Sequence, residues 1–201
     1  MSLRDDLVIA ATELLDEGGP ENVTLREVGR RTGVSRTAPY RHFTSKSGLL
    51  ATVAAEELRQ LVVDVEALLR AGRPAAEVLR QAMLHYVRWA RTRPERFRLV
   101  FGRWQEESDE LQQAAGRANE LLVELVHRSQ TEGALPPGDL WSMAAAIRAF
   151  AHGVAVLEQT GHLLGRDRRP MDAVVLVESY LAIAPDQVFR FASPAVDPAA
   201  P

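Results

Sequence analysis

The chain has 201 residues, of which 46% are hydrophobic and 25% charged, as is typical of a soluble globular protein. No apolar run approaches the roughly 18 residues needed to span a bilayer, and the acidic start MSLRDDLVIA does not resemble a signal peptide. The absence of cysteine excludes disulfides and thiolate metal sites, so the sequence predicts a cytoplasmic protein.

The charge is distributed unevenly along the chain. The formal net charge is −3, but residues 24–46 hold six Arg or Lys residues and one Glu, a net of +5, which leaves about −8 on the rest. A basic island in an acidic protein is expected of a nucleic-acid-binding surface, although solvated basic faces are also common. The island therefore indicates nucleic-acid binding without establishing it.

Apolar residues recur at spacings of three and four, and no strand-like alternation persists, which predicts an all-α fold of about nine helices. The first helix is expected to open with a cap formed by Ser2 and Asp5 and to stop at 18–20. Thr24 and Glu27 predict a capping box for the second helix, and Gly33 is placed to end that helix in a left-handed conformation.

A third, short helix is expected at 36–43, with Ser35 as its N-cap, after the connection Gly33-Val34-Ser35. Two short helices joined in this way form a helix-turn-helix. Pro39 is expected to face inward, where its missing N–H costs one backbone bond at most. The opposite face carries polar side chains suited to bases and phosphates, although a solvated surface helix is the simpler alternative.

Six further helices are expected at about 45–69, 75–91, from 94, 107–130, 139–163 and 169–183. The first of these would link an N-terminal head, 1–48, to a helical body, 49–190. The proline-rich end, 191–201, is predicted to be disordered.

The segment VTLREVGRRTGVSRTAPYRHFTSKSGLL, residues 23–50, resembles the DNA-binding head of the TetR family of bacterial transcriptional regulators. The resemblance implies an N-terminal helix-turn-helix with its motif at 24–43, in which Pro39 replaces a more usual leucine. It implies phosphate contacts from Thr24, Tyr40 and Lys46. It also implies that the short helix faces base edges through Arg36, Thr37, Ala38, Arg41 and His42, and Ser35 of the turn is a further expected DNA contact.

The remaining helices resemble the same family more loosely, which implies a ligand pocket in the body and a dimer interface formed by the last two helices. The segment IRAFAHGVAVLEQTGHL, with Trp141 upstream, is similar to the WHG subgroup, named for Trp, His and Gly. Small residues spaced by four also favour close helix contact, although both helices could pack within one subunit. The expected interface residues are Ala145, Ala149, His152, Gly153, Val174, Val177 and Leu181.

A largely apolar effector is expected in a pocket lined by aromatic and aliphatic side chains, although such residues are more often plain core. The candidates are Met83, Tyr86, Trp89, Phe97, Phe101, Trp104, Leu121, Leu125 and Phe150. The histidines match no zinc or hydrolase spacing, and no nucleophile elbow or phosphate loop occurs, so no enzyme activity, metal or cofactor is expected.

The sequence thus predicts a homodimeric regulator, a repressor that binds a palindromic operator and is released by a small molecule. The alternative is an all-helical small-molecule-binding or catalytic domain whose basic head is incidental.

Overall fold

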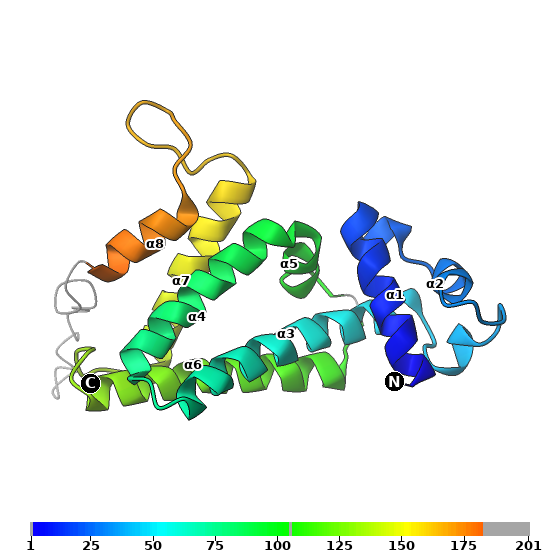
Figure 1. Cartoon of the computed structure of the whole chain (residues 1–201), viewed down its shortest axis with the longest axis horizontal. Helices are drawn as coiled ribbons and strands as arrows, with labels where there is room; N and C mark the ends of the chain where they lie inside the picture. The colour runs from blue at the N-terminus through cyan, green and yellow to red at the C-terminus, as the bar shows by residue number, and fades with distance from the viewer. Residues whose placement is uncertain (1, 105, 183–201) are drawn as a thin grey trace, which may run out of the picture.

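The computed structural model describes residues 2–104 and 106–182, and within them every regular element is helical (Figure 1). The α-helices are α1 (Leu3–Gly18), α2 (Leu25–Arg31), α3 (Lys46–Arg70), α4 (Ala75–Thr92), α5 (Pro94–Val100), α6 (Asp109–Thr131), α7 (Leu140–Gln159) and α8 (Ala173–Ala182). Two 3-10 helices, η1 (Pro20–Asn22) and η2 (Pro39–Arg41), complete the described elements. The predicted all-α class is confirmed.

The helices form a small head and a larger body joined by α3 (Figure 1). The head core contains residues of α1, α2 and the start of α3, such as Leu7, Val28 and Leu49. The body core contains residues further along α3, such as Val62, together with α4, α6, α7 and α8. The predicted domain boundary after residue 48 therefore falls inside one continuous helix.

Local capping interactions set the starts of the head helices. Ser2 and Asp5 form the predicted capping box, and the backbone N–H of Gly48 donates to Ser45 Oγ at 3.0 Å to open α3. Only one of the two hydrogen bonds of the predicted Thr24–Glu27 capping box forms. The N–H of Glu27 donates to Thr24 Oγ1 at 3.1 Å, but the Glu27 carboxylate accepts hydrogen bonds from Arg30 instead of reaching back.

The predicted α-helix at 36–43 is wrong, because the segment forms only the short 3-10 helix η2 and adjoining turns. The N–H of Ala38 donates to Ser35 O at 3.0 Å and that of Arg41 to Ala38 O at 3.1 Å, both three residues back. Pro39 has no N–H to start an α-helical ladder here. Ser35 does not act as an N-cap through its side chain, since its Oγ lies 3.5 Å from Thr37 Oγ1.

Pro39 is buried, as predicted, and packs against α2 at Gly29. A Cβ atom on Gly29 would lie 2.9 Å from Pro39 Cγ, closer than side chains normally approach. The two residues therefore fit only because one lacks a side chain. Gly33 closes α2 with φ +70°, and the N–H of Val34 donates to Gly29 O at 3.1 Å.

The last two helices are shorter than the predicted 139–163 and 169–183. Helix α7 ends at Gln159, and two residues later Gly161 has a φ of +71°. Residues 160–172 form a projecting loop (Figure 1). Within this loop the N–H of Gly165 donates to Arg169 O at 2.9 Å, so the chain has turned before α8 starts at Ala173. Residue 183 and the predicted disordered tail, 191–201, lie outside the described residues.

We predict that Gly29→Ala destabilises the protein by about 1 kcal/mol or more, because the new methyl group overpacks against the Pro39 ring. Gly116→Ala in α6 is the matched control, since no atom lies within 4 Å of its Cβ position, and it is expected to stabilise by about 0.5–1 kcal/mol. Urea unfolding of both variants measures the difference. Equal stability of the two variants would contradict the contact, and Pro39→Ala added to Gly29→Ala is expected to restore stability.

Candidate functional site

Most of the residues predicted to contact DNA have exposed side chains. The side chains of Thr24, Ser35, Arg36, Thr37, Tyr40, Arg41 and His42 are exposed, and those of Ala38 and Lys46 are half-buried. Tyr40 is 57% exposed, so its ring and hydroxyl are accessible from solvent. The buried Pro39 and Phe43 hold this segment against α2 and α3.

Ion pairs neutralise part of the basic island. Arg30 pairs with Glu27, Arg31 donates two hydrogen bonds of 2.8 Å to Glu17, and Lys46 Nζ lies 3.6 Å from Glu21. The hydrogen bond from Arg31 holds the pKa of the exposed Glu17 carboxyl below its usual value.

Three cations of the island keep no acidic partner. Among the described residues, no carboxylate lies within 4.0 Å of Arg26, Arg36 or Arg41. Counting charges along the sequence could not separate paired from unpaired cations, because Glu17 and Glu21 belong to α1 and η1, outside the basic stretch. These three arginines are the cations most available to a polyanion.

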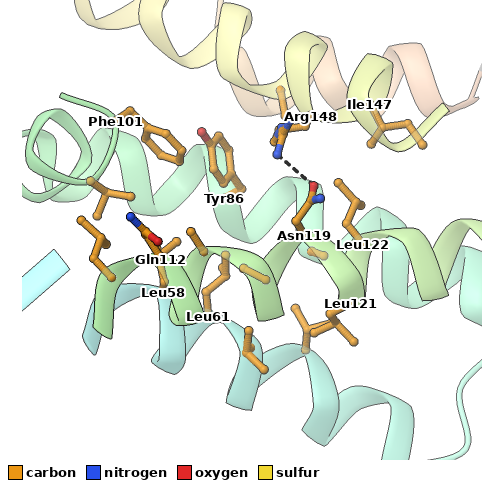
Figure 2. Close-up of a pocket in the computed structure, with 18 of the residues that line it drawn as sticks. Leu58, Leu61, Tyr86, Phe101, Gln112, Asn119, Leu121, Leu122, Ile147 and Arg148 are labelled. Carbon is orange, nitrogen blue, oxygen red and sulfur yellow. Dashed lines mark hydrogen bonds between the residues drawn. The ribbon is translucent and has the colours of Figure 1, made fainter. Parts of the chain in front are cut away.

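A cavity of about 650 Å³ lies in the body, between α3, α4, α6 and α7 (Figure 2). Of the predicted lining residues, the cavity brings together Met83, Tyr86, Phe101, Trp104, Leu121 and Leu125. Its other walls were not predicted: they include Leu58, Leu61 and Val62 of α3, Ala115, Ala118 and Leu122 of α6, and the polar Gln112, Asn119 and Arg148. The apolar stripe of α3 was the available signal, but a stripe alone does not distinguish a cavity wall from packed core.

Three predicted pocket residues do not line this cavity, because each is engaged elsewhere. Trp89 Nε1 donates to Glu57 at 2.9 Å, and Phe97 is buried and stacks on His152 with ring centroids 5.1 Å apart. Phe150 stacks on Tyr180 at 4.0 Å.

Polar side chains line the cavity in two places: Tyr86, Asn119 and Arg148 come from α4, α6 and α7, and Glu106, Glu107, Ser108 and Gln112 lie at or near the start of α6. Arg148 Nη1 donates to Asn119 Oδ1 at 2.9 Å, and Tyr86 Oη lies 2.9 Å from His152 Nδ1 (Figure 2 shows the first pair). Burial, with a further contribution from the Arg148 charge, lowers the pKa of His152, so its imidazole is neutral at pH 7. Burial raises the pKa of the Tyr86 hydroxyl.

Glu110, in the first turn of α6, links the cavity region to the head. Its carboxylate accepts hydrogen bonds from Arg4 of α1 at 2.9 Å, from Thr52 of α3 at 2.9 Å, and from Arg59 of α3. Burial raises the pKa of Glu110, but the bonds from Arg59 and Thr52 outweigh it and leave the pKa below the usual value. No local sequence signal predicts this cluster, whose partners are far apart in the chain.

Two more contacts cross the same junction. Arg96 of α5 binds Asp16 of α1 at 2.9 Å and Glu57 of α3 at 2.7 Å. Trp104 lines the cavity and also packs against the head core, and its indole N–H is buried with no acceptor among the described residues. Trp104 therefore contacts both the cavity and the head core.

The predicted dimer residues divide between exposed and buried positions. Ala145 and Ala149 are exposed, His152, Gly153 and Val174 are half-buried, and open space surrounds the Cβ position of Gly153. Val177 has no exposed surface and packs in the subunit's own core, so a contact from Val177 to a partner is wrong. Leu181 lies in α8, but its side chain is outside the described residues.

The exposed surfaces of α7 and α8 carry large apolar side chains together with the charged Arg148 and Glu178. Trp141 is 57% and Val175 59% exposed. By length and composition alone, helix α7 could cross a membrane. Only 33% of its most apolar 18-residue stretch is buried within the subunit. The sequence reading missed this property because charged residues interrupt the apolar run. A helix that covers an oligomer interface has the same character.

Two family descriptions match the chain. Residues 7–53 match the "Bacterial regulatory proteins, tetR family" head, and residues 79–179 match the "Tetracyclin repressor-like, C-terminal domain". The chain belongs to the TetR family. The resemblance inferred from residues 23–50 is therefore confirmed, whereas similarity to the WHG subgroup stays a prediction.

Solved and curated proteins agree with the TetR fold. A protein of unknown function from Rhodococcus sp. RHA1 is 26% identical, with a TM-score of 0.77 over 90% of this chain and 93% of that chain. The regulator FadR from Bacillus subtilis, solved with stearoyl-CoA, is 17% identical, with a TM-score of 0.67 over 90% of this chain and 96% of FadR. The transcriptional activator FasR of Mycolicibacterium smegmatis is 31% identical over 98 residues, which span 49% of this chain and 45% of FasR.

Proposed function

We propose that this TetR-family chain is a homodimeric, DNA-binding transcriptional regulator whose operator affinity is controlled by a small molecule in the body cavity. The observation that carries the proposal is the exposed turn 35–42 on a TetR-type head, in which Arg36 and Arg41 have no acidic partner within the described part of the chain. Its polar side chains face solvent while Pro39 and Phe43 hold its inner side.

The proposed contacts divide by chemistry. Arg36, Thr37, Ala38, Arg41 and His42 would meet base edges, because guanidinium, hydroxyl and methyl groups match the donors, acceptors and methyls of the major groove. Thr24, Tyr40 and Lys46 would hold phosphates, with Ser35 beside them in the turn. In a dimer, two such heads would enter successive major grooves of a palindrome, about 34–36 Å apart.

A gel-shift titration on DNA from upstream of the chain's own gene tests the proposal. Specific binding should exceed binding to random DNA and fall steeply as salt rises, because phosphate contacts release counterions. Equal and weak binding to all DNA would favour the alternative, a helical small-molecule-binding domain whose basic head is incidental.

The dimer is proposed to form through the outer faces of α7 and α8. Small residues on α7, namely the exposed Ala145 and Ala149 and the half-buried Gly153, allow a second helix to approach closely. Trp141 of α7 and Val175 of α8 add exposed apolar surface. Two copies of this face would form a four-helix contact around a two-fold axis.

The cavity is proposed to bind a largely apolar effector, and its volume lies within the range of ordinary ligand pockets. The stearoyl-CoA in FadR of Bacillus subtilis supports this, since a protein of the same fold holds a ligand with a long apolar chain. An effector that prefers a body shape with a different head position would weaken operator binding by about 1–3 kcal/mol.

The family's role in transcription also supports a non-enzymatic, cytoplasmic protein. We propose repression as the sign of regulation, although FasR, similar over half of this chain, is named an activator. Transcription from the bound promoter, with and without the protein, decides the sign.

We predict that Lys46→Ala weakens binding to operator and random DNA alike, because a phosphate contact carries no base information. The slope of log binding constant against log salt concentration should fall in magnitude by about one.

Arg36→Ala should instead change the preference for particular bases at particular operator positions by about 1–3 kcal/mol, and Thr37→Ala by less. Selection from a randomised operator library, with salt titrations, measures both effects. If Arg36→Ala and Thr37→Ala both kept the wild-type base preference, the contacts that determine operator sequence would lie outside this turn.

Gly153→Leu is predicted to break the dimer, because its side chain would separate the two closely packed α7 helices. Within the described subunit the position is open at Cβ, since no atom lies within 4 Å of the Gly153 Cβ position. Gly116→Leu is the matched control on exposed α6, with equally open space. Sedimentation velocity should show a monomer only for Gly153→Leu, with helical circular dichroism intact in both. A Gly153→Leu dimer as tight as the wild type would place the interface elsewhere.

A further inference from the structure

We propose that the cavity selects an amphiphile with an anionic head group, and that Arg148 binds this head while the apolar tail lies along α3. The inference rests on the proposed function and specifies the chemistry of its effector.

Arg148 is the one cation among the described residues that line the cavity. No carboxylate of the described residues lies within 4.0 Å of it, and its recorded partner is the neutral side-chain oxygen of Asn119 at 2.9 Å. A guanidinium has five N–H donors, so this single bond leaves most of them for another acceptor. Figure 2 shows Arg148 of α7 and Asn119 of α6 pointing toward each other, joined by their hydrogen bond.

The position of Arg148 fits an amphiphile better than a fully apolar ligand. The residue is exposed as well as cavity-lining, so it lies where the cavity meets solvent. A charged head bound there keeps part of its hydration, which avoids the cost of burying a charge. The tail can then cover the aliphatic wall formed by Leu58, Leu61 and Val62.

Charge along the cavity also sets the direction of the ligand. Glu106 and Glu107 line the end of the cavity next to Asp109, the first residue of α6. Asn119, which binds Arg148 of α7, lies ten residues further along α6. Ten helical residues span about 15 Å. An anionic head is therefore repelled at the acidic end and attracted at Arg148.

The test compares ligands with one tail and different heads on the full-length dimer. Decanoate, decan-1-ol and decyltrimethylammonium share a ten-carbon chain, and decanoyl-CoA carries the anion on phosphates instead of a carboxylate. Isothermal titration calorimetry with wild type, Arg148→Gln and the control Arg117→Gln gives the dissociation constants. Arg117 is a suitable control because it also projects from a helix, pairs with Glu66 and does not line the cavity.

We expect the wild type to bind decanoate or decanoyl-CoA about 10-fold to 100-fold more tightly than decan-1-ol, and the cation more weakly still. Arg148→Gln should remove this preference without changing decan-1-ol binding, and Arg117→Gln should behave as wild type. Tighter binding of decanoate or of decanoyl-CoA then identifies which anion the site prefers.

Two results would overturn the inference. Equal binding of decanoate and decan-1-ol, unaffected by Arg148→Gln, would leave an apolar effector site without head-group selection, so the proposed regulation would stand. Failure of all four ligands to bind would reject both the amphiphile and the apolar-effector part of the proposed function, while gel shifts report the DNA-binding part separately.

Discussion

Helix α3 constrains the whole molecule, because one unbroken helix of 25 residues belongs to both hydrophobic cores. Its first turns, with Leu49 and Val53, are packed in the head, and its later turns, with Val62 and Val65, are packed in the body and line the cavity. Close-packed interiors transmit displacement instead of absorbing it. The proposed regulation uses this helix: a change in the cavity wall would be passed along α3 to the head that carries Arg36 and Tyr40.

Glu110 adds a second link beside this helix. It lies one residue before Leu111, which lines the cavity, and it binds Arg4 of the first helix together with Thr52 and Arg59 of α3. Half-exposed ion pairs of this kind contribute about 1 kcal/mol or less each. Energies of that size match the 1–3 kcal/mol by which an effector typically changes the affinity of another site. The junction is strong enough to hold the head and weak enough for a ligand to shift.

Sequence periodicity and capping predicted most of the helices, because those signals are local: Ser45 opens α3 and Gly33 closes α2 as expected. The family was also predicted from residues 23–50. The structure of residues 36–43 was not predicted correctly. Pro39 lacks the N–H that an α-helix needs there, and the segment forms a 3-10 helix and turns in which Pro39 packs against Gly29. The pairing of Arg31 with Glu17, the Glu110 cluster and the position of Arg148 all join residues far apart in the chain, which no local pattern specifies.

The central claim, that occupancy of the cavity moves the heads, is tested most directly by the distance between the two heads of the dimer. The chain has no cysteine, so Ile9→Cys, an exposed position of the head helix α1 outside the proposed DNA contacts, gives one spin-label site per subunit for pulsed electron paramagnetic resonance. The distance distribution should shift when decanoate saturates the cavity, as followed by calorimetry, and operator affinity should change with it. An unchanged distribution with the cavity saturated would contradict the account.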